Sequence, residues 1–121
     1  MLISDAIKEA DRLKPNSFTT EDKLRWLERL EKRICNEILS HYTTPAPTVE
    51  PFTTEDLSRE LIVPDPYDEI YIHWLCAQMD YYEREMDSFN AANMMFEAVF
   101  VQYRNWYNWN HTANTAQKNY F

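Results

Sequence analysis

No residue of this chain is glycine, although it is 121 residues long. Glycine is the residue that readily adopts positive φ and lets the backbone approach a ligand closely. Phosphate-binding loops, the dinucleotide-binding fingerprint and the serine nucleophile elbow all need it, so these enzyme classes are disfavoured. Tight β-hairpins that prefer Asn-Gly or Asp-Gly turns are disfavoured for the same reason. The absence of glycine therefore predicts an all-α fold.

Composition predicts one acidic globular domain. Apolar residues make up 45% of the chain, which is enough for a hydrophobic core, and the length fits a single domain. The formal net charge of -8 repels nucleic-acid phosphates and anionic lipids, so we expect neither sequence-specific nucleic-acid binding nor membrane association. No apolar run approaches the ~20 residues that span a bilayer. We expect a soluble protein made in the cytoplasm.

Two amphipathic helices are predicted in the first third of the chain. Ser4 can cap the first, whose apolar face includes Leu13 and which Pro15 ends. Thr19 or Thr20 can cap the second, and its charged face, with Lys23, is expected to be solvated. The apolar stripe of the second helix comprises Leu24, Leu27, Leu30, Ile34, Cys35 and Ile38.

The second half of the chain predicts a helical hairpin. After the Pro- and Thr-rich connection 42–51 and a brief helix from Phe52, Asp65 can cap a third main helix with Pro66 as its first residue, running to about Glu85. Its apolar positions fill two adjacent arcs, so it should be central. Asp87 or Ser88 can cap the last helix, whose predicted inner seam is Phe89, Ala92, Phe96, Val99, Tyr103 and Trp106. The prediction is thus a bundle of four main helices plus a short helix, built round a long C-terminal hairpin, with a domain over 1–110 and a flexible tail over 111–121.

A metal or catalytic centre is a weaker interpretation of the same residues. Cys35, Cys76, His41 and His73 match the ligand count of a zinc site. However, Cys35 and His41 would point about 240° apart on a regular helix, and in this context both cysteines are expected to be free thiols. The acidic residues Asp68, Glu69, Glu83, Glu85 and Asp87 crowd helix ends, where acids normally favour the dipole or are solvated. We expect no metal, no cofactor and no enzyme activity.

Aromatic residues are the most distinctive side chains of the hairpin. Of the 18 aromatic residues, 14 lie from Tyr67 onward, which is more than a two-helix hairpin can readily bury. Tyr, Trp and Met are favoured at protein interfaces. The alternative is that the first two helices cover them all. We predict an interface that includes Met94, Val101, Trp109, Tyr82 and Met86.

Several segments carry a resemblance to a protein family. They are 61–71 (LIVPDPYDEIY), 74–82 (WLCAQMDYY), Phe89-Asn90, Phe96 and 106–108 (WYN), together with 3–7 (ISDAI), 13–16 (LKPN) and 23–27 (KLRWL). In these segments the chain resembles small phage and prophage proteins encoded among the virion-assembly genes of tailed phages of Gram-positive bacteria. The polar and aromatic end of the chain, 110–121, departs from that pattern.

The resemblance implies a helical head–tail connector or adaptor subunit. Such a protein would form a homo-oligomeric ring against the portal, contact other capsid and tail proteins, and pass from the host cytoplasm into the virion. The family offers no catalytic motif to carry over. Two other functions stay open at this point: a prophage-encoded regulatory or inhibitory protein that binds a host protein, and a helical metal-dependent enzyme.

Overall fold

The computed structural model describes the backbone of residues 1–42, 45 and 47–120, and their side chains as far as His111. Four α-helices and three short 3-10 turns make up the regular structure of this part. The helices are α1 (Ile3–Leu13), α2 (Thr20–Glu37), α3 (Ile70–Tyr82) and α4 (Met86–Tyr120), and the turns are Leu39–His41, Thr54–Asp56 and Tyr67–Glu69. The predicted all-α bundle built round a C-terminal hairpin is confirmed.

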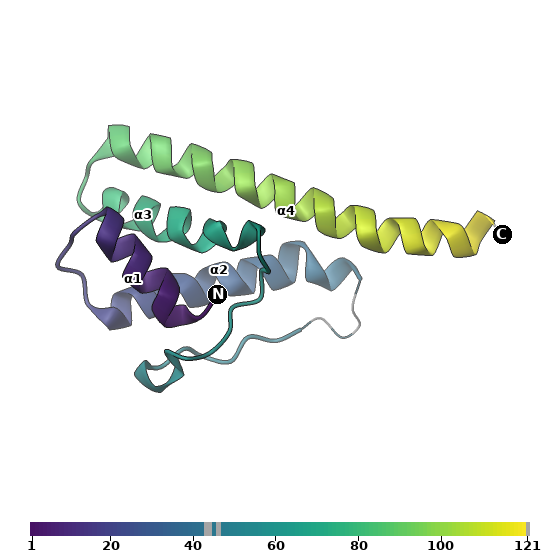
Figure 1. The fold of residues 1–121 in the computed structure, drawn as a ribbon, viewed down its shortest axis with the longest axis horizontal. Helices are drawn as coiled ribbons and strands as arrows, with labels where there is room; N and C mark the ends of the chain where they lie inside the picture. The colour runs from purple at the N-terminus through teal and green to yellow at the C-terminus, as the bar shows by residue number, and fades with distance from the viewer. Residues whose placement is uncertain (43–44, 46, 121) are drawn as a thin grey trace.

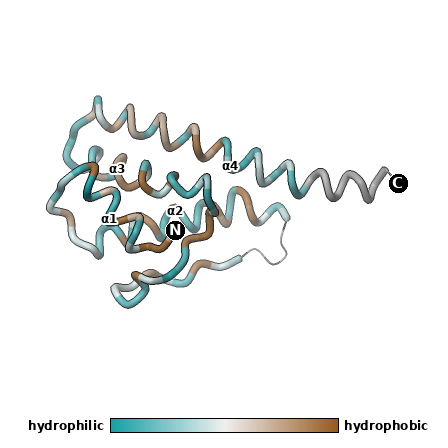
Figure 2. Tube along the Cα trace, viewed as in Figure 1, coloured by the Kyte–Doolittle hydropathy of each residue, from teal (hydrophilic) through white to brown (hydrophobic). Residues whose placement is uncertain are grey.

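Helix α3 lies at the centre of the bundle, as its two apolar arcs predicted. It runs antiparallel to α4 along one side, while α1 and α2 pack against it from the other sides (Figure 1). Helix α4 is the longest element and projects past the rest of the bundle (Figure 1). Hydrophobic stretches recur along its first half, where it accompanies α3 (Figure 2).

The beginning of α1 is capped by a distant loop and not by Ser4. The backbone N–H of Ile3 donates to the Arg59 carbonyl at 3.0 Å, and that of Ser4 donates to the Leu57 carbonyl at 2.9 Å. The loop thus satisfies donors that a helix start leaves without an intrahelical partner. Leu2 occupies the cap position, so the prediction for Ser4 is wrong. Leu13, predicted on the apolar face, is 54% exposed at the other end.

Helix α2 follows its prediction except at Lys23. Thr19 caps it by accepting the Asp22 N–H at 3.1 Å, and all six residues of the predicted stripe are buried. Lys23, which was expected to be solvated, is only 5% exposed. Its Nζ lies 2.9 Å from the Asp11 carboxylate of α1, and this ion pair lets the lysine enter the interface between the two helices.

The ends of α3 and α4 differ from the prediction. Pro66 precedes a 3-10 turn and α3 itself begins at Ile70, while α3 ends at Tyr82 and not near Glu85. Helix α4 begins at Met86, one residue before the first predicted cap. Between the helices, Arg84 adopts φ 61°, the left-handed region that glycine would normally occupy.

The last residues of α4 fall in the segment for which the sequence predicts a flexible tail. The α-helix continues to Tyr120, so the backbone beyond residue 110 is helical. Side chains after His111 lie outside the described residues. The division between a domain over 1–110 and a tail over 111–121 stays a prediction.

A buried carboxylate joins α2, α3 and the loop before α3. Glu31 is 2% exposed; one of its oxygens accepts the Tyr71 hydroxyl and the other accepts the Ile62 N–H at 2.9 Å. The Tyr71 hydroxyl in turn accepts the Val63 N–H at 2.9 Å. Burial raises the pKa of Glu31, although these two hydrogen bonds oppose the shift. Burial and the neighbouring carboxylate also raise the pKa of Tyr71.

Within the described part of the chain, no helix combines the length and apolar character needed to traverse a bilayer.

The burial of Glu31 generates a pH-dependent prediction. Its folded pKa lies above the ordinary value of 4.5, so its contribution to stability is full below that value and is lost as pH rises through the folded pKa. Wild type should therefore gain stability relative to Glu31→Gln as pH falls from neutrality toward 4.5, measured by urea unfolding of both proteins. A difference that does not change with pH would contradict this assignment.

A second substitution at the same residue tests its hydrogen bonds. Glu31→Leu should lower the free energy of unfolding by about 3 kcal/mol at about pH 7, because it leaves the buried Tyr71 hydroxyl and Ile62 N–H without an acceptor.

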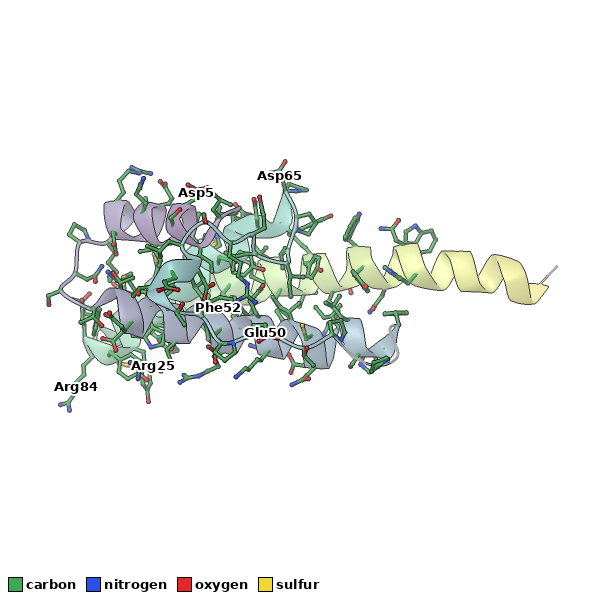
Figure 3. The ribbon with its side chains drawn as sticks, turned by 90° about the horizontal axis from the view of Figure 1, so that it is seen from below. Asp5, Arg25, Glu50, Phe52, Asp65 and Arg84 are labelled. Atoms are coloured by element: carbon green, nitrogen blue, oxygen red, sulfur yellow. The ribbon has the colours of Figure 1, made fainter. Side chains whose placement is uncertain are left out.

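The conformation of Arg84 generates a second prediction. Its side chain is exposed and points away from the body of the protein (Figure 3), so the positive φ is the main constraint at this position. Arg84→Gly should stabilise the protein by up to about 1 kcal/mol, because removing Cβ relieves the left-handed conformation by more than the added freedom of the unfolded chain costs. Arg84→Ala, which keeps Cβ, is the matched control and should show no gain in thermal unfolding.

Candidate protein-binding surface

Helix α4 has an inner side that is buried and an outer side that is open. Phe96, Val99, Phe100 and Tyr103 are at most 5% exposed and belong to the core. At about 100° per residue, the opposite side of the helix carries a second set of residues. We call this set the α4 outer face. It comprises Ala91, Met94, Met95, Ala98, Val101, Gln102, Asn105 and Trp109, all of which are exposed.

The α4 outer face is apolar at its largest side chains and uncharged throughout. Met94 is 73% exposed, Trp109 74% and Met95 53%. The remaining members are alanines, a valine and two amides, so no charged group lies among them. Monomeric proteins rarely leave such a strip of Met and Trp open, and both residue types are enriched at protein interfaces. The face therefore has the character of a binding surface.

One flank of this face carries charge. Glu97 and Arg104 line a hollow between α2 and α4 together with Arg33, Glu37, Phe100 and Val101. The Arg33 guanidinium lies 4.5 Å from the centre of the Phe100 ring and 2.6 Å from the Glu37 carboxylate, so it is held by both. Its distance to the Glu97 carboxylate is longer, at 3.9 Å.

Tyr82 and Met86 belong to a different surface at the α3–α4 turn. We call it the aromatic end; its residues are Phe18, Tyr81, Tyr82, Met86 and Phe89, and the buried Trp26 lies beneath them. The Tyr82 ring stacks on Trp26 with centroids 5.5 Å apart and planes 9° from parallel, and Phe18 meets the Trp26 ring edge-on at 5.2 Å. Tyr82 remains 50% exposed and Met86 49%. Stacking thus holds Tyr82 in place while leaving half of it open to solvent.

The structure divides the five predicted interface residues between these two surfaces. Met94, Val101 and Trp109 lie on the α4 outer face, whereas Tyr82 and Met86 lie at the aromatic end. Met95 was missed, although it follows Met94 directly and a helical wheel places it on the same side. Trp106, predicted for the inner seam, is 41% exposed at the margin.

The buried side of α4 also includes residues outside the predicted seam. The Asn108 side-chain oxygen accepts the Tyr42 hydroxyl at 2.8 Å, and the residue is half-buried. Phe100 was not assigned to the seam and is 3% exposed, because α2 as well as α3 covers α4 at this level. The inner side of α4 is therefore wider than the predicted seam.

The ionisable groups of the interior are suited to structure more than to chemistry. Burial raises the pKa of both cysteine thiols, which keeps them protonated and weakens them as nucleophiles. Asp80 is buried and paired with Lys14, and that hydrogen bond raises the pKa of the lysine. Among the residues described, no three His, Cys, Asp or Glu side chains come together as a metal site would require.

No protein-family model matches this chain, and neither a curated protein nor a solved structure does.

The α4 outer face predicts contrasting effects for two substitutions on the same helix. Met94→Asp should change the free energy of unfolding by no more than about 0.5 kcal/mol, because the side chain is solvated, but should weaken self-association. Val99→Asp places the same charge on the buried side and should cost more than about 3 kcal/mol. Chemical denaturation and sedimentation velocity measure the two effects. A Met94→Asp protein that associates like wild type would remove Met94 from any interface between copies.

Proposed function

We propose that this protein is a structural subunit of a tailed-phage virion, a head–tail connector or adaptor that works by binding other proteins. It would be made in the host cytoplasm, assemble into a homo-oligomer, bind the portal and other capsid or tail proteins, and remain in the virion. The phage setting rests on the resemblance of segments 61–71 and 74–82 to small virion-assembly proteins. The binding role rests on the surfaces of the protein.

The observation that carries the binding role is the presence of two separate exposed apolar surfaces. The α4 outer face presents Met94 and Trp109, and the aromatic end presents Tyr82 and Met86. A subunit placed between two kinds of neighbour needs at least two surfaces. These surfaces come from different parts of the hairpin, so they can be occupied at the same time.

Charge supports the same proposal. The net charge of -8 would keep genomic DNA from adhering to a protein that stands beside the path of DNA through the vertex.

Capture by a portal protein tests the proposed function. The purified protein is mixed with the portal of a tailed phage of a Gram-positive host, and size-exclusion chromatography with light scattering measures the mass of the complex. We expect co-elution with the portal, and we expect Tyr82→Asp at the aromatic end to weaken it about tenfold or more. Lys8→Glu, on the exposed side of α1, is the control and should bind like wild type.

The same purified protein tests the alternative that the chain is a regulatory or inhibitory protein. A stable complex with one host protein, and no association with portal, capsid or tail proteins from the phage whose genome encodes this chain, would contradict the connector role and support inhibition of that host protein.

A further inference from the structure

The seam of the α4 outer face repeats every seven residues. Ala91, Met94, Ala98, Val101 and Asn105 follow one another at alternating intervals of three and four along the helix. An interval pattern of this kind keeps one strip facing a partner helix over several turns, as in a coiled coil. Alanine at 91 and 98 adds room for a second helix to approach closely along this strip.

The charged flank of the seam has the same repeat. Glu97 and Arg104 each precede a seam residue by one position, Ala98 and Asn105, and are therefore on the same flank. They are two turns apart, about 10 Å along the axis, which is too far for them to pair with each other. Glu97 is 3.9 Å from Arg33, and no ion pair to Arg104 is formed by the side chains that the structure describes.

The seam and its charged flank are self-complementary when the α4 helices of two copies run antiparallel. In an antiparallel pair in which Ala98 faces Val101 of the second copy, Met94 faces Asn105 of the second copy. The same register brings Glu97 of each copy beside Arg104 of the other, so two ion pairs form. We propose that the α4 outer face binds a second copy of this chain in an antiparallel, two-fold arrangement.

A parallel pair would not use the charges in this way. It would place the flank of Glu97 and Arg104 against the opposite margin of the face, where the residues are Met95, Gln102 and Trp109. No ion pair could form there. Antiparallel pairing also has free access, because α1, α2 and α3 all lie on the inner side of α4 (Figure 1).

The two-fold pair goes beyond the proposed connector role and does not depend on it. A two-fold contact closes after two subunits, whereas ring contacts continue from one subunit to the next. The aromatic end stays uncovered in the pair and remains available to other proteins. The α4 outer face thus serves self-association, and Tyr82 and Met86 are left for different partners.

Charge reversal in the full chain tests this pairing by sedimentation equilibrium. Glu97→Lys sets two basic side chains against each other at both contacts, and Arg104→Glu sets two acidic side chains against each other at both contacts. Each variant alone should therefore dimerise about tenfold more weakly or worse. The two variants mixed in equal amounts should form a heterodimer of about wild-type affinity. In that pair the new lysine at position 97 of one copy meets the new glutamate at position 104 of the other, and the native Arg104 and Glu97 meet at the second contact, so both contacts join opposite charges. The double variant carrying both changes should recover its own dimer for the same reason.

Controls separate this effect from net charge and from folding. Glu83→Lys and Lys8→Glu change the net charge equally at exposed positions away from the face, and their dimer affinity should match wild type. All variants should keep the wild-type unfolding midpoint at concentrations where every protein is monomeric, since Glu97 and Arg104 are exposed.

A wild-type protein that stays monomeric at millimolar concentration would overturn the pairing, and so would single variants that dimerise normally or a double variant that fails to recover. Portal capture is measured separately. A monomer that binds portal would overturn only the two-fold pair, and a charge-dependent dimer that ignores every virion protein would overturn only the connector role.

Discussion

The fold depends on one buried carboxylate that links three segments of the chain, α2, α3 and the loop between them. Glu31 of α2 accepts hydrogen bonds from Tyr71 of α3 and from the backbone at Ile62, and Tyr71 in turn holds Val63. The chain between α2 and α3 is long, and its described residues form no strand that could hold it. These bonds, together with those from Ile3 and Ser4 to the same segment, determine where it crosses the bundle. With Leu61 and Val63 fixed and buried, α3 is placed at the centre, and α4 can only pack along its remaining side.

The absence of glycine shapes the hairpin on which both exposed surfaces are built. The turn between α3 and α4 spans three residues, and Arg84 accepts the left-handed conformation within it. Backbone bonds from Arg84 to Tyr81 and from Glu85 to Asp80 close the turn, while Lys14 pairs with the buried Asp80 carboxylate beneath it. The ion pair of Lys14, the residue that follows α1, thus helps to offset an unfavourable backbone position. The result is a short connection that keeps α3 and α4 in register over the aromatic seam.

Helical segments and their buried stripes could be predicted from the sequence because they depend on local periodicity. The stripe of α2 and the central place of α3 are examples, since each follows from the spacing of apolar residues. Features that depend on distant partners could not be predicted. Ser4 does not cap α1, because the carbonyls of Leu57 and Arg59 accept the first N–H groups of the helix. Lys23 is buried because its ammonium group pairs with Asp11. Met94 and Trp109, which were predicted for an interface, are exposed, whereas the position of Tyr82 on a different surface depends on its stacking against Trp26.

The capping of α1 by a loop also orders events during synthesis. The carbonyls that bond to Ile3 and Ser4 belong to Leu57 and Arg59, and Leu2 and Glu60 form an isolated antiparallel bridge beside them. When α1 leaves the ribosome, none of these partners has been translated. The apolar face of α1 packs against α3, which begins more than about fifty residues later in the chain. During elongation, α2 is the first helix available to cover this face. Helix α1 therefore reaches its final hydrogen-bonded position only after the loop that caps it has been made.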